Sequence, residues 1–137
     1  MTKKNSYDGK SVYLISIGWI DIKFNFKHVK PGNYKLFINQ IFLDSNIKEK
    51  MIIIVLLGDK SIYKDDNYPS ESIMKNEFIN DLKESFICNI EEKDFKDVNL
   101  DARGDAVVNL IFQGKNNNIK KKWVIDGARL LEVENLK

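Results

Sequence analysis

Aromatic and acidic side chains that could bind a sugar lie close together in one polar segment of the sequence. Tyr63 and Tyr68 border the segment, and Asp65 and Asp66 lie between them. An aromatic ring can stack on the apolar face of a pyranose, while carboxylates hold its hydroxyl groups. These four residues are therefore our first candidates for a carbohydrate-binding site, in a loop expected from residue 64 to residue 72.

Two tryptophans are further candidates for stacking on a sugar. Residues typical of β-strands flank both Trp19 and Trp123, so a place in the core is the alternative for each. Three lysines, Lys120 to Lys122, precede Trp123, and such a pattern can bind nucleic acid. Lysines beside a hairpin also protect an exposed strand edge from aggregation, and we expect no nucleic-acid partner.

Residues that commonly serve in catalysis or in metal clusters are scarce. His28 is the only histidine and Cys88 the only cysteine, which excludes metal sites built from several histidines or cysteines. The common nucleotide-binding and hydrolase motifs are absent from the sequence. Cys88 follows two apolar residues, a context that favours burial over reactivity. We therefore expect a protein without enzyme activity, catalytic residues or cofactor.

Carboxylates are numerous, and two interpretations of them stay open. Two acidic residues could act as a glycosidase pair, although no spacing in the sequence selects them. Oxygen atoms of Asp97, Asn99, Asp101 and Asp105 could bind Ca²⁺, although the spacing is not that of an EF-hand. Solvated surface residues are the simpler interpretation, and we expect no metal. The Arg-Gly-Asp tripeptide that ends at Asp105 is expected to form a tight turn.

Length and charge are those of one small soluble domain. The chain has 137 residues and a net charge of +2, which gives no general attraction to nucleic acid or membranes. Its longest apolar run, Met51–Leu57, is far shorter than the roughly 20 residues of a membrane helix. The polar N-terminus does not resemble a signal peptide. We expect a cytoplasmic or nucleocytoplasmic protein without a membrane partner.

Alternation of apolar and polar residues predicts β-strands along most of the chain. The clearest case is the strand expected at residues 18–26, where the apolar side chains of Ile22, Phe24 and Phe26 share one face. Further strands are expected at residues 34–43, 51–57, 61–63, 86–90, 106–113 and 122–133. Residues 51–57 are apolar on both faces, as in a central strand.

Turn residues and one helical pattern complete the expected organisation. Pro31 and Gly32 predict a turn in which the glycine has a positive φ, and Gly127 predicts a bulge. Met74, Phe78 and Leu82 follow one another at helical spacing, so a short helix is expected near residues 73–84, with a strand as the alternative. Many short strands with at most one helix predict an all-β chain.

We therefore expect residues 1–137 to form a single antiparallel β-sandwich of the jelly-roll kind, with residues 1–9 flexible.

Four segments of the chain resemble, in the same order, segments of the phloem protein 2 family of plant-type lectins. They are Gly9–Ser16 (a Gly-Lys pair before an aromatic and aliphatic residues), Trp19–Ile22 followed by Lys30–Phe37, Ile53–Asp59 followed by Ile62–Tyr63, and Val124–Leu130. The resemblance implies a nucleocytoplasmic β-sandwich that binds N-acetylglucosamine oligomers or N-glycan cores without a metal. Tyr13 occupies the aromatic position of the opening motif and is the first stacking residue that the resemblance implies. Trp19 corresponds to a tryptophan of the family, and a structural role is the alternative for it.

The expected partners are thus glycans or glycoproteins, with a homodimer as one possible assembly. The alternative function is a protein-interaction or substrate-receptor module without sugar activity, because sandwiches of this type also serve as recognition domains in ubiquitin-ligase adaptors. A hydrolase function is the third hypothesis, and only the abundant carboxylates support it.

Overall fold

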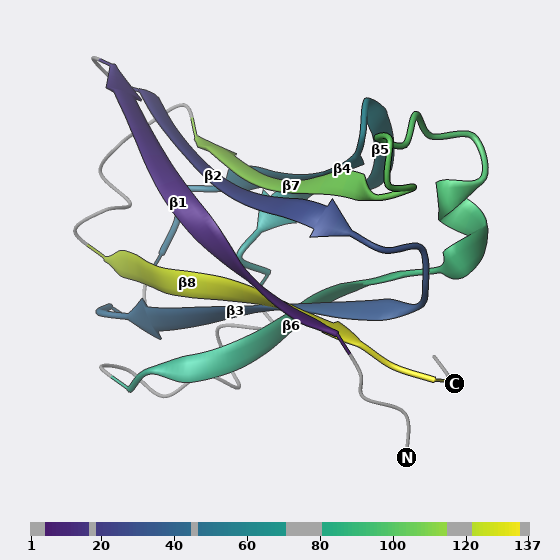
Figure 1. The fold of residues 1–137 in the computed structure, drawn as a ribbon. Coiled ribbons are helices and arrows are strands. Elements are labelled where there is room, and N and C mark those ends of the chain that lie inside the picture. Colours follow the sequence, from purple (N-terminus) through teal and green to yellow (C-terminus); the bar gives the residue numbers. More distant parts are fainter. Residues whose placement is uncertain (1–4, 17–18, 45–46, 71–80, 115–121, 135–137) are drawn as a thin grey trace.

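The computed structural model describes residues 5–16, 19–44, 47–70, 81–114 and 122–134, with residues 10–16, 19 and 20 described by their backbone alone (Figure 1). The described strands are β1 (Ser6–Ser16), β2 (Trp19–Val29), β3 (Tyr34–Phe42), β4 (Met51–Leu57), β5 (Lys60–Tyr68), β6 (Lys83–Ile90), β7 (Ala106–Gly114) and β8 (Trp123–Glu132). One short 3-10 helix, η1 (Glu92–Phe95), lies between β6 and β7. Within these ranges, no helix is long and apolar enough to span a membrane.

The strands form two antiparallel layers that pack face to face (Figure 1). Sheet I has the strand order β5-β4-β7-β2, and sheet II has the order β1-β8-β3-β6. Strands therefore pair in nested order, β1 with β8, β2 with β7, β3 with β6 and β4 with β5. A long hairpin rolled around a core gives this nesting, which is the jelly-roll topology. The predicted antiparallel β-sandwich is confirmed.

Strand β1 belongs to both layers and joins them along one side. Residues 6–9 pair with β8 in sheet II, whereas residues 10–16 pair with β2 in sheet I. At the crossing point, a Cβ on Gly9 would lie 2.8 Å from Cζ of Phe26, so only glycine fits there without displacing the ring. Residues 6–9, for which flexibility was expected, pair with β8, while residues 1–4 lie outside the described ranges.

Alternate residues of the strands face the space between the sheets. The burial of β4 alternates from residue to residue, with Ile53 and Val55 inside, and β4 lies between β5 and β7 as expected of a central strand. Phe112 of β7 is fully buried, and the centroids of two aromatic rings, Tyr68 and Trp123, lie 5.9 and 5.4 Å from its own. Tilted and edge-on ring pairs of this kind stabilise a core beyond their buried area.

One polar side chain, Gln40 of β3, lies inside this core with 1% of its surface exposed. Its oxygen accepts hydrogen bonds from the hydroxyl of Tyr68 and from Nε1 of Trp123, the latter at 2.9 Å. Its nitrogen donates to Oγ of Ser85 at 2.9 Å. Because Tyr68 comes from sheet I and the other partners come from sheet II, the amide of Gln40 links the two sheets through the core.

Two expected elements differ from the structure. The expected strand at residues 61–63 is longer than predicted, because β5 runs to Tyr68, which pairs with Met51 of β4; the polar loop expected from residue 64 is therefore wrong up to Tyr68. The helix expected near residues 73–84 is wrong at its C-terminal end, because Lys83 already pairs with Gln40 at the start of β6. Residues 73–80 of that expectation lie outside the described ranges.

Among the described residues, positive φ angles occur at Gly58, Gly104 and Gly127 and at one residue other than glycine. Gly127 has a φ of +107° at a register shift between β3 and β8, so the expected bulge is confirmed. Gly32 does not have a positive φ, and a Cβ there would instead approach Oε2 of Glu132 at 2.8 Å. The left-handed residue of this segment is His28, with a φ of +60°.

The link through Gln40 can be tested by removing its polar group while keeping its volume. Gln40→Met takes away the acceptor of Trp123 Nε1, and an unpaired buried donor costs roughly 1–3 kcal/mol. We expect the free energy of unfolding, measured by urea denaturation, to fall by about that amount. Asn39→Met on the opposite face of β3 is the control and should change it by less than about 1 kcal/mol. Equal losses in the two variants would contradict the role given to Gln40.

Candidate functional site

A pocket of about 670 Å³ opens at one end of sheet I, where the β4–β5 turn meets the segment between η1 and β7. Its lining combines carboxylates, side-chain amides and aliphatic side chains. The residues are Asp59, Asp97, Asp101 and Asp105; Asn99 and Asn109; Leu57, Val98, Leu100 and Val107; and Gly58 and Lys60. A volume of this size and a mixed lining are typical of sites for small ligands.

The β4–β5 turn forms one wall of the pocket. Gly58 has a φ of +60° and is the first of two residues between the paired Leu57 and Lys60, a position that favours glycine in tight hairpins. A Cβ on Gly58 would lie 2.7 Å from Cγ1 of Val98, so the turn and the opposite segment are in direct contact. The amide of Gly58 also donates to the carbonyl of Val107 at 2.8 Å, which fixes the turn against β7.

The opposite wall contains the loop from Asp101 to Asp105, which is closed by its own hydrogen bonds. The amide of Asp101 donates to the carbonyl of Asp105 at 2.8 Å, and the amide of Gly104 donates to the carbonyl of Asp101 at 2.9 Å. Oδ1 of Asp101 accepts two further bonds, from the amides of Arg103 at 2.8 Å and of Asp105 at 3.0 Å. The tight turn expected at the Arg-Gly-Asp tripeptide is confirmed.

These bonds determine the electrostatics of Asp101. The backbone N–H groups of Asp105 and then Arg103, with a smaller contribution from His28, hold the pKa of the Asp101 carboxyl below its usual value. Hydrogen bonds to the charged form of a carboxyl have this effect. Asp101 is thus a fixed negative charge at neutral pH, and it adds to the three other carboxylates of a lining that contains one lysine, Lys60.

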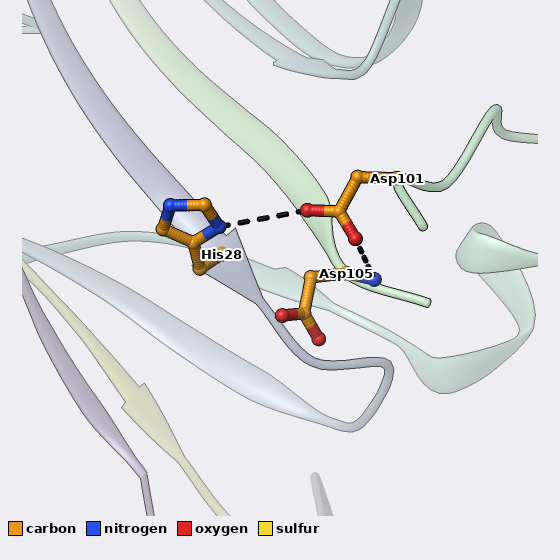
Figure 2. A group of neighbouring side chains, drawn as sticks. All are labelled: His28, Asp101 and Asp105. Atoms are coloured by element: carbon orange, nitrogen blue, oxygen red, sulfur yellow. Dashed lines mark hydrogen bonds and ion pairs between the residues drawn. The ribbon is translucent and has the colours of Figure 1, made fainter. Parts of the chain in front are cut away.

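One group of side chains near this wall has the composition of a metal site (Figure 2). His28, Asp101 and Asp105 each offer a ligand atom, and these atoms all lie within 4.8 Å of one another. Nδ1 of His28 faces Oδ2 of Asp101 at 3.5 Å. Sequence reasoning identified Asp101 and Asp105 as possible oxygen ligands but left out His28, which is 73 residues away in the chain.

Two of the residues predicted to bind sugar lie in the core instead. Tyr68 and Trp123 are each 2% exposed, and both donate to the side-chain oxygen of Gln40. Neither ring has a face open to solvent, so stacking on a sugar is excluded for both in this structure. Their place is explained by strand register, because each falls on the inner face of its strand and pairs with a buried residue, Met51 or Phe42.

The other predicted residues lie away from the pocket or outside the description of side chains. Tyr63, Asp65 and Asp66 belong to the edge strand β5, where Tyr63 is half-buried and Asp66 is exposed. Burial, with a smaller contribution from Asp65, raises the pKa of the Tyr63 hydroxyl. The structure describes only the backbone of Tyr13, which pairs with Ile22, and of Trp19.

Sequence reasoning missed the part of the pocket that β4 and β5 supply. Gly58 and Asp59 form the turn between the strands expected at residues 51–57 and 61–63, and Lys60 begins β5, but nothing in a turn sequence marks it as a site. Only the pairing of β4 with β7 brings Asp59 next to Asp101 and Asp105.

Comparison with known proteins gives no relative from which a function could be inferred. No family model matches the sequence, and no protein of curated function matches it.

Cys88 is buried in β6 and has the properties of a structural residue. Burial, with a smaller contribution from Asp94, raises the pKa of its thiol to about 12. At pH 8 only about one thiol in ten thousand would then be the reactive thiolate. We expect iodoacetamide, followed by intact mass, to alkylate Cys88 in the folded chain at least about a hundredfold more slowly than free cysteine. The difference should disappear in denaturant, and rapid alkylation of the folded chain would contradict the assignment.

Proposed function

We propose that this chain is a carbohydrate-binding protein and that the pocket at the end of sheet I is its sugar site. The observation that carries the proposal is the lining of the pocket. Carboxylates and amides around one hollow can hold several hydroxyl groups at once, and the aliphatic side chains Val98, Leu100 and Val107 offer contacts to the apolar faces of a sugar ring. Jelly rolls are a common architecture of lectins, which is an analogy of fold only.

The charges of the pocket select the kind of sugar. Four aspartates and a single lysine line it, so a phosphate or a carboxylate on the ligand would meet like charges. Asn109 accepts a hydrogen bond from Nδ2 of Asn25 at 2.6 Å through its oxygen, which leaves its amide nitrogen as a donor. The ligand is therefore a neutral oligosaccharide rather than an acidic one.

The resemblance to phloem protein 2 lectins narrows the proposal to N-acetylglucosamine oligomers or N-glycan cores. An N-acetyl group needs a hydrogen-bond donor for its carbonyl and an apolar contact for its methyl. Asn109 and Val107, which are two residues apart on the same face of β7, offer these two features. The aromatic platform expected from Tyr68 and Trp123 has no part in this site.

A glycan array followed by titration with chitin oligomers tests the proposal. We expect binding of neutral N-acetylglucosamine-containing glycans by the full chain. Asp97→Ala and Asn99→Ala should each weaken binding about tenfold or more, because a hydrogen bond to a charged or well-placed polar group contributes roughly 1.5 kcal/mol. Both side chains are exposed and form no hydrogen bond with the described residues, so neither change should affect folding.

Asp66→Ala is the matched control, since Asp66 is an exposed aspartate of β5 outside the pocket. It should bind like the original chain. Loss of binding in Asp66→Ala with full binding in Asp97→Ala would place the site on β5 instead. Failure to bind any glycan would overturn the carbohydrate-binding function itself.

A protein-interaction module is the second candidate, and one surface of sheet II favours it. Phe86 of β6 is 50% exposed, with the ring of Phe37 at 5.9 Å between centroids and Nζ of Lys35 at 5.2 Å over its ring. An exposed aromatic residue beside charged groups is common at protein interfaces. If no glycan binds, Phe86→Ser should abolish association with a protein partner.

A further inference from the structure

We propose that His28, Asp101 and Asp105 bind a divalent transition-metal ion of the zinc type. The proposal does not rest on sugar binding, because it concerns this cluster alone and its test contains no sugar. The three residues come from the end of β2 and from the loop before β7, which β-sheet pairing brings side by side (Figure 2).

The imidazole is aimed at the cluster by an irregularity of β2. The register between β2 and β7 shifts between Phe26 and Val29, so that two residues of β2 lie where β7 has one. His28 is one of these two residues, and its φ is +60°. A bulge of this kind redirects a side chain, and a left-handed conformation is uncommon for residues other than glycine, although histidine adopts it more often than most. The bulge turns His28 toward Asp101.

The carboxylate of Asp101 is oriented by the backbone of its own loop. Both hydrogen bonds from the amides of Arg103 and Asp105 go to Oδ1. Oδ2 is therefore the oxygen that faces Nδ1 of His28, at 3.5 Å. Two ligands of a tetrahedral zinc ion are about 3.4 Å apart when each bond is about 2.0–2.1 Å. This pair thus has nearly the separation of zinc ligands, and hydrogen bonds of the outer shell hold one member in place.

Asp105 gives the observation that points to a ligand. It is 8% exposed, and its side chain forms no hydrogen bond or ion pair with any residue in the part of the chain that the structure describes. Its oxygens are not among the unpartnered side-chain atoms of the described residues that are shielded from solvent, so a cation that enters the pocket can reach them. Figure 2 shows its carboxylate beside the His28–Asp101 pair, and its oxygen lies within 4.8 Å of the other two ligand atoms. A cation held by all three residues would compensate this charge.

The donor set selects the metal. One imidazole nitrogen and two carboxylate oxygens suit Zn²⁺ and its first-row neighbours, whereas Ca²⁺ prefers six to eight oxygen ligands. Three protein ligands leave the fourth position of a tetrahedral ion for water or another molecule. Because ligand atoms up to 4.8 Å apart must approach to about 3.4 Å, the exposed side chain of His28 would rotate slightly on binding.

Isothermal titration with Zn²⁺, on the chain without a histidine tag, tests the proposal. We expect one Zn²⁺ per chain and no comparable binding of Ca²⁺ or Mg²⁺. Since His28 is the only histidine, its imidazole signals in NMR spectra should shift on addition of Zn²⁺. His28→Asn keeps a residue that tolerates a positive φ but removes the imidazole, and it should weaken binding at least about tenfold.

Asp105→Asn should weaken Zn²⁺ binding to a similar extent, whereas Asp66→Asn, which removes an exposed carboxylate elsewhere, should leave it unchanged. Circular dichroism verifies that each variant is folded, and His28→Asn keeps the test valid if Asp105→Asn does not fold. Absence of Zn²⁺ binding, unchanged binding in His28→Asn, or stronger binding of Ca²⁺ than of Zn²⁺ would each overturn the proposal. Failure of the glycan array would not affect it.

Discussion

The space between the two sheets excludes water, so a polar group there needs a partner within the chain or in a ligand. Gln40 and Asp105 are the buried polar residues of the described chain, and they meet this constraint in different ways. Gln40 is fully compensated, because its amide interacts with side chains of both sheets. The sandwich is therefore held in one arrangement by a hydrogen-bonded group as well as by apolar packing.

Asp105 lies at the boundary between this core and the pocket. Its backbone is fixed by Asp101, yet its carboxylate has no partner among the described residues. Partly buried charged groups of this kind are common at functional sites. The proposed metal site and the proposed sugar pocket share Asp101 and Asp105. A metal ion bound there would therefore also reduce the negative charge of the pocket lining.

The jelly-roll topology explains why the pocket forms where it does. Nested pairing places the β4–β5 turn next to the start of β7, although Asp59 and Asp101 are far apart in the sequence. The same pairing of β2 with β7 places His28 beside the loop that precedes β7. Loops at one end of a rigid sandwich can thus bring polar side chains from several segments close together, while the sheets hold the loops in position.

The sequence by itself determined the local features of this protein. Apolar runs identified the β4 and β7 strands, Gly127 marked its bulge, and the Arg-Gly-Asp tripeptide marked its turn, because these features depend on neighbouring residues. Only the tertiary structure decided which side chains meet. Tyr68 and Trp123 became core residues through strand register, and His28 joined two aspartates through a bulge opposite β7. Contacts between distant segments depend on pairing, which local patterns do not encode.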